Sequence, residues 1–369
     1  MSLIAENQAF AQQTLLEEAE SYLRESVAPK ASEIDSNPAV LKEVLKQMGV
    51  RSLLALRVPK VWGGMEVSNE TFRNFQVLLA RYSGALAFLQ IQHQGAAGLI
   101  SYSENESLKQ RYLPQIAKGE IFVGIGFSQL RRKGEPLIKA LQSEGGYKIE
   151  GKVPWVTGFD FFKDFIVGAL LPDNRAIYGI VPFTETYQEA GGALSFSEPM
   201  QLSAMQSTNT VSATFTNWFL PEENVVFVTK EAGTIHENDK KNVLFAGFLA
   251  LGCARAGLDI VETAAKTKQM DFLYNAFESL NDEFTRCQTA MMDEIAAKSQ
   301  SFEENLQLRV WAINLAGRCA QAAVTVSSGA ANYKHHAAQR VYREALMFTV
   351  SGQTTEVMEA TLARLVHDS

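Results

Sequence analysis

Cysteine is scarce in this sequence, and the shortage limits the chemistry that the protein can use. Of the 369 residues only three are cysteines, Cys253, Cys287 and Cys319. Their spacing fits no metal-binding pattern, so no metal site is predicted, and their odd number is typical of reduced thiols. Each lies in an apolar stretch of helical character, where a thiol behaves as a small hydrophobic group. We therefore expect three buried, free thiols.

Segments that would direct the chain to a membrane are also missing. The N-terminal residues MSLIAENQAFAQQ show no basic region followed by an apolar run, so no signal peptide is predicted. The longest apolar run, Val243 to Ala254, is expected to be too short to cross a bilayer. The sequence therefore predicts a soluble, cytoplasmic protein with no membrane partner.

A concentration of positive charge is the third absence. The formal net charge is -7, and the charged residues form no basic face along the chain, which argues against a nucleic-acid partner. One short basic run, Arg131 to Lys133, could meet a single phosphate. A solvated loop is the simpler interpretation of that run.

The composition is otherwise that of a globular protein, and the chain divides into three regions. Hydrophobic residues make up 46% of the sequence, which allows a large core and two or three domains. Within residues 1–118 apolar residues recur at helical spacing, which predicts an N-terminal helical domain. Three such stripes are Leu15-Leu16-Ala19-Leu23-Val27, Leu41-Val44-Leu45-Met48 and Phe72-Phe75-Leu78-Leu79-Tyr82.

Residues 119–232 change to a strand pattern. Gly145-Gly146 separates two alternating segments, and Pro172-Asp173-Asn174 separates two apolar runs, so both are expected to be hairpin turns. This region is predicted to be an antiparallel β domain. Residues 233–369 return to helical spacing, with a capping-box signature at Ser301 and Glu304. Long helices joined by short links predict a C-terminal bundle that offers a surface for homo-oligomers.

The residue patterns predict an α+β protein of three domains, but on their own they indicate little about its chemistry. The sequence has no glycine-rich phosphate loop and no cluster of metal ligands. His335 and His336 are adjacent, so they cannot point to one side of a helix.

Several segments nevertheless resemble the acyl-CoA dehydrogenase family, and they follow one another in the family's order over nearly the whole chain. They are Pro59 to Gly64, Gln110 to Glu120, Glu150 to Gly158, Phe219 to Val225, Tyr342 to Ala345 and Thr354 to Val357. The resemblance implies an N-terminal all-α domain, a middle β-barrel and a C-terminal four-helix bundle. It also implies FAD held between domains, a homodimer or homotetramer, and α,β-dehydrogenation of an acyl-CoA thioester, with the electron acceptor left unknown.

The resemblance assigns flavin contacts to particular residues. Trp155 and Thr157 occupy the positions beside the isoalloxazine ring, where a Trp stacks and a hydroxyl bonds the polar edge. Phe127 and Ser128 correspond to the pair that meets the pyrimidine edge of that ring. The loop that follows, Gln129 to Glu135, departs from the family pattern and has become basic.

Three further positions are assigned near the C-terminal domain. Thr354 and Glu356 correspond to a second FAD contact, although capping of a final helix would explain them equally well. Lys268 corresponds to an arginine that reaches the FAD of a partner subunit in the family. It keeps the charge but loses the bidentate fork of arginine.

The catalytic base of the family has no counterpart at its expected position. That carboxylate removes the α-proton of the substrate, and its position corresponds to Gly352. Some members carry the base earlier, at a position near Asn242, and Asp239 is three residues away. The first hypothesis is therefore a dehydrogenase or oxidase with a relocated base.

Two other hypotheses remain open on the sequence. A flavin monooxygenase or oxidase of the same fold needs no carboxylate base, and His93 could stabilise a peroxide there, although a buried interface histidine is the simpler reading. A catalytically silent binding or assembly protein would explain the altered Gln129 to Glu135 loop.

Overall fold

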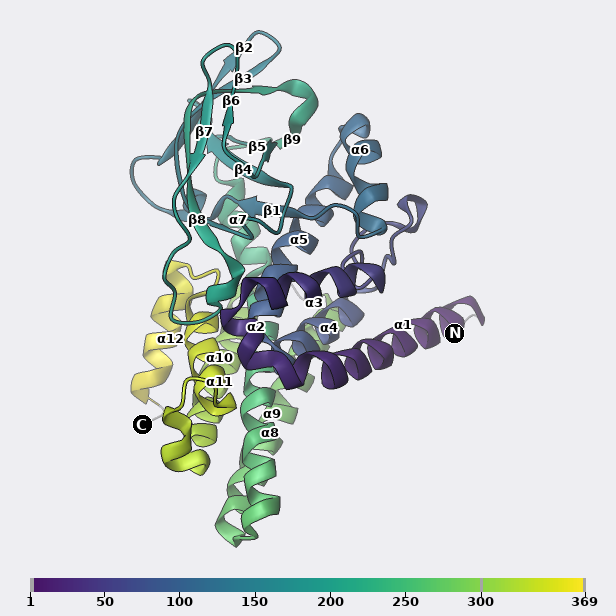
Figure 1. Ribbon diagram of the computed structural model, residues 1–369, viewed down its shortest axis with the longest axis vertical. Coiled ribbons are helices and arrows are strands. Elements are labelled where there is room, and N and C mark those ends of the chain that lie inside the picture. Colours follow the sequence, from purple (N-terminus) through teal and green to yellow (C-terminus); the bar gives the residue numbers. More distant parts are fainter. Residues whose placement is uncertain (1–2, 299–300, 368–369) are drawn as a thin grey trace.

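The computed structural model describes residues 3–298 and 301–367, which form a helical region, a sheet and a second helical region (Figure 1). The first region consists of α1 (Leu3–Tyr22), α2 (Ala31–Ser36), α3 (Pro38–Val50), α4 (Asn69–Tyr82), α5 (Gly84–Tyr102) and α6 (Glu106–Ala117), with a π-helical turn at Leu23–Val27 and short 3-10 turns at Ala28–Lys30 and Lys60–Trp62.

The apolar stripes predicted for this region are its core. The second stripe lies on α3, where Leu41, Leu45 and Met48 are fully buried. The third lies on α4, where Phe72, Phe75 and Leu79 are buried. Ser68 begins α4 by accepting a hydrogen bond from the Thr71 N–H, and Ser83 begins α5 in the same way. The predicted helices are therefore confirmed.

The middle region is a nine-stranded sheet, shown at the top of Figure 1. Its strands are β1 (Val123–Gly126), β2 (Ile138–Ser143), β3 (Gly146–Thr157), β4 (Asp164–Leu170), β5 (Ala176–Pro182), β6 (Thr186–Tyr187), β7 (Ala193–Phe196), β8 (Thr210–Pro221) and β9 (Val225–Val228). Both predicted hairpins are present, since β2 pairs with β3 around Gly145 and β4 pairs with β5.

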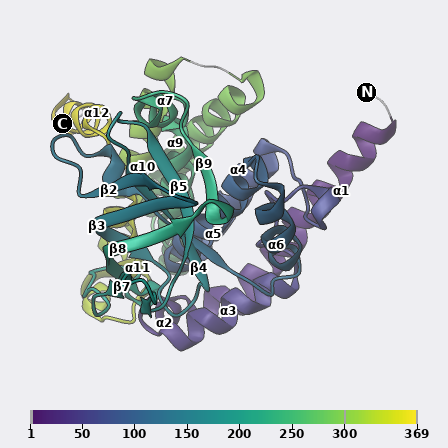
Figure 2. The same cartoon turned by 90° about the horizontal axis from the view of Figure 1, so that it is seen from above.

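Strand pairing corrects two details of the expected β domain. The order is β6-β7-β8-β3-β2-β4-β5-β9, and β1 pairs with β4. In the described residues the two end strands do not pair, so the sheet is open and the word barrel fits it only loosely. The β1–β4 pairing is parallel, because β1 enters the sheet directly from the helical region rather than through a hairpin. Viewed from above, the strands lie between α12 and α6 (Figure 2).

The C-terminal region contains α7 (Thr234–Lys241), α8 (Gly247–Lys268), α9 (Asp271–Ala297), α10 (Phe302–Ser327), α11 (Ala337–Val350) and α12 (Thr355–His367), with short 3-10 segments at Val243–Ala246 and Ser328–Asn332. Helix α10 packs along α8, and α9 and α11 pack on this pair, which gives the bundle. Ser301 begins α10 by accepting from the Glu304 N–H, as its capping signature predicts. Cys253, Cys287 and Cys319 are buried and free, as expected.

The prediction made for this region considered only part of its apolar helix. The helical segment Val243–Lys268 is long and apolar enough, by length and composition, to cross a membrane. Only the unbroken apolar run was considered in the sequence, whereas the helix continues past Arg255 and Asp259. In the structure 72% of its most apolar window is buried, so the apolar composition is that of a core helix packed between α4 and α10.

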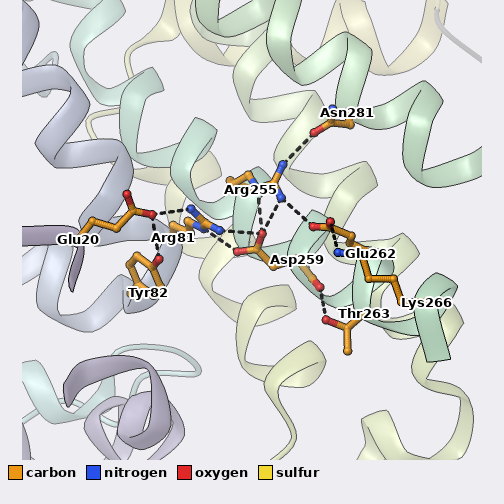
Figure 3. A network of polar contacts seen from close by, with 9 residues as sticks. All are labelled: Glu20, Arg81, Tyr82, Arg255, Asp259, Glu262, Thr263, Lys266 and Asn281. Atoms are coloured by element: carbon orange, nitrogen blue, oxygen red, sulfur yellow. Dashed lines mark hydrogen bonds and ion pairs between the residues drawn. The ribbon is translucent and has the colours of Figure 1, made fainter. Parts of the chain in front are cut away.

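A network of charged side chains joins the two helical regions (Figure 3). Arg81 of α4 donates to Asp259 of α8 at 2.6 Å and to Glu20 of α1 at 3.1 Å. Arg255 of α8 donates to the same Asp259 and to Asn281 of α9. Ion pairs that are only partly exposed are screened less by salt, so this network contributes to holding α1, α4, α8 and α9 together.

Candidate active site

A cavity of about 500 Å³ lies where the three regions meet. This volume is within the range of pockets that hold cofactors and small molecules. Its walls are formed by helices α4 and α5, strands β1 and β3, helix α7, the start of α8, helix α10 and the loop before α12. The lining residues of the sheet region are Ile125, Phe127, Ser128, Arg131, Trp155 and Thr157.

The sheet wall contains all four residues predicted to meet the flavin ring in this region. Trp155 is 52% exposed although it lies within a long strand. A register shift between Val153 and Val156 marks a bulge that contains Pro154 and Trp155. Because the bulge adds a residue, both valines face the core while the Trp155 ring faces away from it. The strand thereby presents a large aromatic surface to the cavity.

Two hydroxyl groups lie on the same wall. Thr157 ends β3, and its Oγ1 is 3.0 Å from Thr210 Oγ1. Ser128 follows Phe127 at the start of a 3-10 turn and is exposed. The buried Gln129 holds this turn by donating from Nε2 to the Gly168 carbonyl at 2.9 Å. The loop that departs from the family pattern therefore begins on a fixed support.

The opposite end of the chain supplies Ser351, Gly352 and Thr354 to the cavity. Gly352 has φ +61°, a left-handed conformation that favours glycine. Arg309 of α10 holds this loop through Nη2, which donates to the carbonyls of Ser351 at 2.8 Å and Gly352 at 3.0 Å. Thr354 also accepts from the Val357 N–H, so it both lines the cavity and caps α12.

The remaining predicted residues lie outside the cavity lining. Glu356 is in the first turn of α12, with its carboxylate 4.0 Å from His236 Nε2. Lys268, in the last turn of α8, donates to the Val326 carbonyl at 2.6 Å. Their predicted FAD contacts remain predictions, and for Lys268 the contact would be made to another subunit.

His93 is fully buried between helix α5 and strand β1 and does not line the cavity. Its Nδ1 accepts a hydrogen bond from the Val123 N–H at 3.0 Å, and the Phe122 and Phe162 rings lie beside it. Burial lowers the pKa of His93 to about 4, opposed by the Val123 carbonyl oxygen 3.3 Å from Nδ1, so the ring is neutral at pH 7. This placement offers no support for contact with a peroxide.

Comparison with known proteins agrees with the arrangement. A family model described as the acyl-CoA dehydrogenase N-terminal domain matches residues 10–120. A probable acyl-CoA dehydrogenase of Bacillus subtilis (strain 168) is 22% identical, over 96% of this chain and 97% of its own length. The N-terminal part of the chain thus matches this family model, and nearly the whole chain is similar to an acyl-CoA dehydrogenase.

Three further proteins resemble the chain over nearly its full length. The 3-(aryl)acrylate reductase of Clostridium sporogenes (strain ATCC 15579) is 21% identical, over 94% of this chain and 95% of its own. A glutaryl-coenzyme A dehydrogenase solved as its glutaryl-CoA complex has a TM-score of 0.81 and 16% identity, covering 96% of this chain and 95% of that one. A Mycobacterium smegmatis glutaryl-CoA dehydrogenase solved with FADH2 has the same TM-score, 13% identity, and coverage of 97% and 95%. The predicted resemblance to acyl-CoA dehydrogenases, the fold and the acyl-CoA dehydrogenase-like enzyme class are thus confirmed.

Two features of the cavity were not found in the sequence. Arg131, interpreted as part of a solvated loop, donates from Nε to both carboxylate oxygens of Asp239 at 2.9 Å, and both residues line the cavity. The two are 108 positions apart, and only the fold brings them together. The second feature is Arg73, a buried arginine of α4 in the cavity wall. Its sequence signal was a basic residue directly beside the buried Phe72 in an amphipathic helix.

Proposed function

We propose that the protein is an FAD-dependent oxidoreductase that acts on the α,β bond of an acyl thioester. The observation that carries this proposal is the meeting of Phe127, Ser128, Trp155 and Thr157 with the Gly352 loop in one cavity. When bound, flavin would supply the hydride acceptor. Similarity to acyl-CoA dehydrogenases supports this cofactor, and the residues of the cavity suit it.

The fit of the flavin ring rests on three properties of the cavity wall. The half-exposed Trp155 offers an aromatic face for stacking. The exposed Ser128 hydroxyl and the Thr157 hydroxyl offer hydrogen bonds to a polar ring edge. Arg131 places a guanidinium on the same wall, and although its Nε is bound by Asp239, its remaining N–H groups suit the oxygens of a phosphate.

The Gly352 loop suits a thioester carbonyl. The Gly352 N–H needs no side chain to donate to a carbonyl oxygen, and such a bond stabilises the charge that develops there. Arg309 fixes the loop by binding its carbonyls, so this N–H is held in place. We infer that the site polarises a carbonyl without supplying a base from position 352.

Candidates for a base elsewhere in the cavity are few. Asn242 lines it but carries a neutral amide. Asp239 is the single carboxylate among the described residues of the lining, and both of its oxygens are bound by Arg131. Losing a general base typically costs two to four orders of magnitude in rate, or about 3–5 kcal/mol of barrier. We therefore expect slow α-proton removal.

The test is anaerobic stopped-flow bleaching of bound flavin by straight-chain acyl-CoAs. We expect slow or undetectable bleaching by the unmodified protein and faster bleaching by Gly352→Glu. The matched control is Gly352→Gln, which has the same size and the same backbone strain at φ +61° but no base. Rapid bleaching by the unmodified protein that disappears in Asp239→Asn would instead assign the base to Asp239.

Flavin binding itself is tested by calorimetry with FAD and FMN. We expect one FAD per subunit, with its fluorescence quenched by Trp155 and its binding weakened in Trp155→Ala. Well-folded protein that binds neither flavin would overturn the proposal and favour a silent binding protein.

Exposed apolar side chains on α11 and α12 support a homo-oligomer. Leu346 is 60% exposed, Val350 51%, Leu362 57% and Leu365 56%. An apolar surface of this kind is expected to be covered by another chain. We propose a homodimer or homotetramer, and light scattering that returns a mass near 40.7 kDa would contradict it.

A further inference from the structure

Arg73 is a buried cation of the cavity whose side-chain hydrogen bond, among the described residues, goes to a neutral amide. It lies on α4, is 4% exposed, and lines the cavity. Its Nη1 donates to the neutral Gln76 side chain at 2.7 Å, and its guanidinium lies 3.6 Å from the centre of the Phe245 ring. Its Nε has no hydrogen-bond partner in the described part of the chain. The guanidinium therefore keeps unused hydrogen-bonding capacity beside an open space.

Other buried arginines differ from Arg73 in that they bind a carboxylate or several backbone carbonyls, although the Nε atoms of Arg309 and Arg340 also lack a partner among the described residues. Arg340 donates to both oxygens of Glu344, at 2.7 and 2.9 Å. Arg309 donates to three backbone carbonyls, those of Val243, Ser351 and Gly352. Buried charges in proteins are normally paired in one of these ways, because an unpaired one is costly. Arg73 departs from this rule in the cavity.

The charge on Arg73 persists despite its burial. Burial, together with the nearby charge of Arg57, lowers the pKa of Arg73 to about 9, so it remains protonated at neutral pH. Arg57 also lines the cavity, and both guanidiniums face the Phe72 ring, at 5.1 Å for Arg57 and 5.3 Å for Arg73. Two cations thus share one part of the wall with no carboxylate beside them in the described structure.

We propose that Arg73 binds a carboxylate group of the substrate, so that the substrate is an organic acid with a free carboxylate besides its reacting carbons. This inference rests on the proposed function, because it places an acyl substrate in the same cavity. A carboxylate matches the planar fork of a guanidinium and forms charge-assisted hydrogen bonds with it. Arg57 adds a second positive charge that a neutral acyl chain would not use.

The surroundings of Arg73 suit the carbon skeleton of such an acid. Phe72, Phe88, Phe245 and Leu249 line the cavity along with it. An apolar wall that carries a few placed polar groups is typical of sites that fix the orientation of a small molecule. The carboxylate could belong to the mono-CoA ester of a dicarboxylic acid, as the proposed thioester chemistry requires, or to an acid without CoA, which would replace the thioester in the proposed function. Binding experiments separate these two sources.

The experiment is calorimetric titration of the FAD-loaded protein with two matched pairs of ligands. Glutaryl-CoA and pentanoyl-CoA differ by a carboxylate in place of a methyl group, and cinnamate and cinnamide differ in charge without CoA. We expect the carboxylate member of one pair to bind on the order of tenfold or more tightly, since a charge-assisted hydrogen bond contributes that much. The pair that shows the preference identifies the source of the carboxylate.

Variants then assign the preference to Arg73. Arg73→Met should abolish it, Arg73→Lys should retain part of it because the charge remains without the fork, and the surface control Arg24→Met should leave it unchanged. Absence of any preference in either pair, or a preference that survives in Arg73→Met, would overturn the inference. Calorimetry does not depend on flavin reduction, so failure of the proposed dehydrogenation would be seen separately in the bleaching experiment.

Discussion

Helix α4 carries two arginines about two turns apart that face different environments, and their difference separates stabilising charge from binding charge. Arg81 lies in the network of Figure 3 and donates to Asp259 and Glu20. Burial alone would lower the pKa of Arg81, but its bonds with Asp259 outweigh burial and raise it. Arg73 lies in the cavity, where burial and Arg57 lower its pKa. The charge of Arg81 therefore stabilises the folded state, whereas the charge of Arg73 destabilises it.

The largest loss of stability is expected when a buried arginine is deprived of its carboxylate partner and so becomes unpaired, as Arg73 is. Glu344 is fully buried and accepts two hydrogen bonds from Arg340. Glu344→Gln leaves the Arg340 charge uncompensated and should lower the free energy of unfolding by about 3–5 kcal/mol, as measured by urea denaturation. Exposed Glu104→Gln is the control. An equal loss in both variants would show that pairing does not matter for a buried arginine in this fold.

His93 is a second buried titratable group that, like Arg73, has no charged partner in the described structure. Its pKa is lowered from 6.5 to about 4, so between these values the folded protein binds fewer protons than the unfolded chain. Stability is therefore complete above pH 6.5 and falls as the pH drops toward 4, by about 3 kcal/mol for this residue. His93→Asn should lose that part of the pH dependence, and exposed His335→Asn should keep it. Identical pH profiles for all three proteins would contradict the assignment.

The Arg81 network gives a smaller expected effect, because its side chains are partly exposed. Asp259 accepts from both Arg81 and Arg255 and is 32% exposed. Asp259→Asn should lower the free energy of unfolding by about 1–2 kcal/mol, and high salt should reduce the difference. Asp282→Asn, at an exposed position on α9, is the matched control. If Asp259→Asn does not lower the free energy of unfolding at low salt, the network does not stabilise the fold.

The smallest change in stability is expected from substituting Gly352, which is part of the cavity wall. Its φ of +61° disfavours a side chain, so Gly352→Ala should destabilise the protein by about 1 kcal/mol. Gly317 lies inside α10 with open space around it, and Gly317→Ala should instead stabilise by about 0.5–1 kcal/mol. Thermal unfolding of the two variants should therefore shift in opposite directions. A shift of both in the same direction would show that the Gly352 conformation is not held as described.

The sequence predicted the features that depend on local order along the chain. Helical stripes such as Leu41 to Met48, the hairpin at Gly145 and the segment around Trp155 each carry their signal within a few residues. The open sheet was not predicted, because strand pairing is non-local and the parallel β1–β4 pairing has no signature in either strand.

The cavity was predicted only in part for the same reason. Phe127, Ser128, Trp155, Thr157, Gly352 and Thr354 were named from their segments, and the fold brings all six to one lining. Arg131 and Asp239 become a pair only when α7 approaches the turn after β1. Arg73 differs from Arg81 only through what packs opposite it, and the sequence of α4 does not contain that information.

Thermal unfolding of Arg73→Met and Arg81→Met without ligand tests the central claim most directly. Both substitutions remove one arginine from α4 and replace it with an unbranched apolar side chain. We predict that Arg73→Met unfolds at the same or a higher temperature than the unmodified protein, because an unpaired buried charge is removed. Arg81→Met should unfold at a lower temperature, because Asp259 and Glu20 lose their partner. Equal destabilisation by the two variants would contradict the claim that Arg73 is held for a ligand.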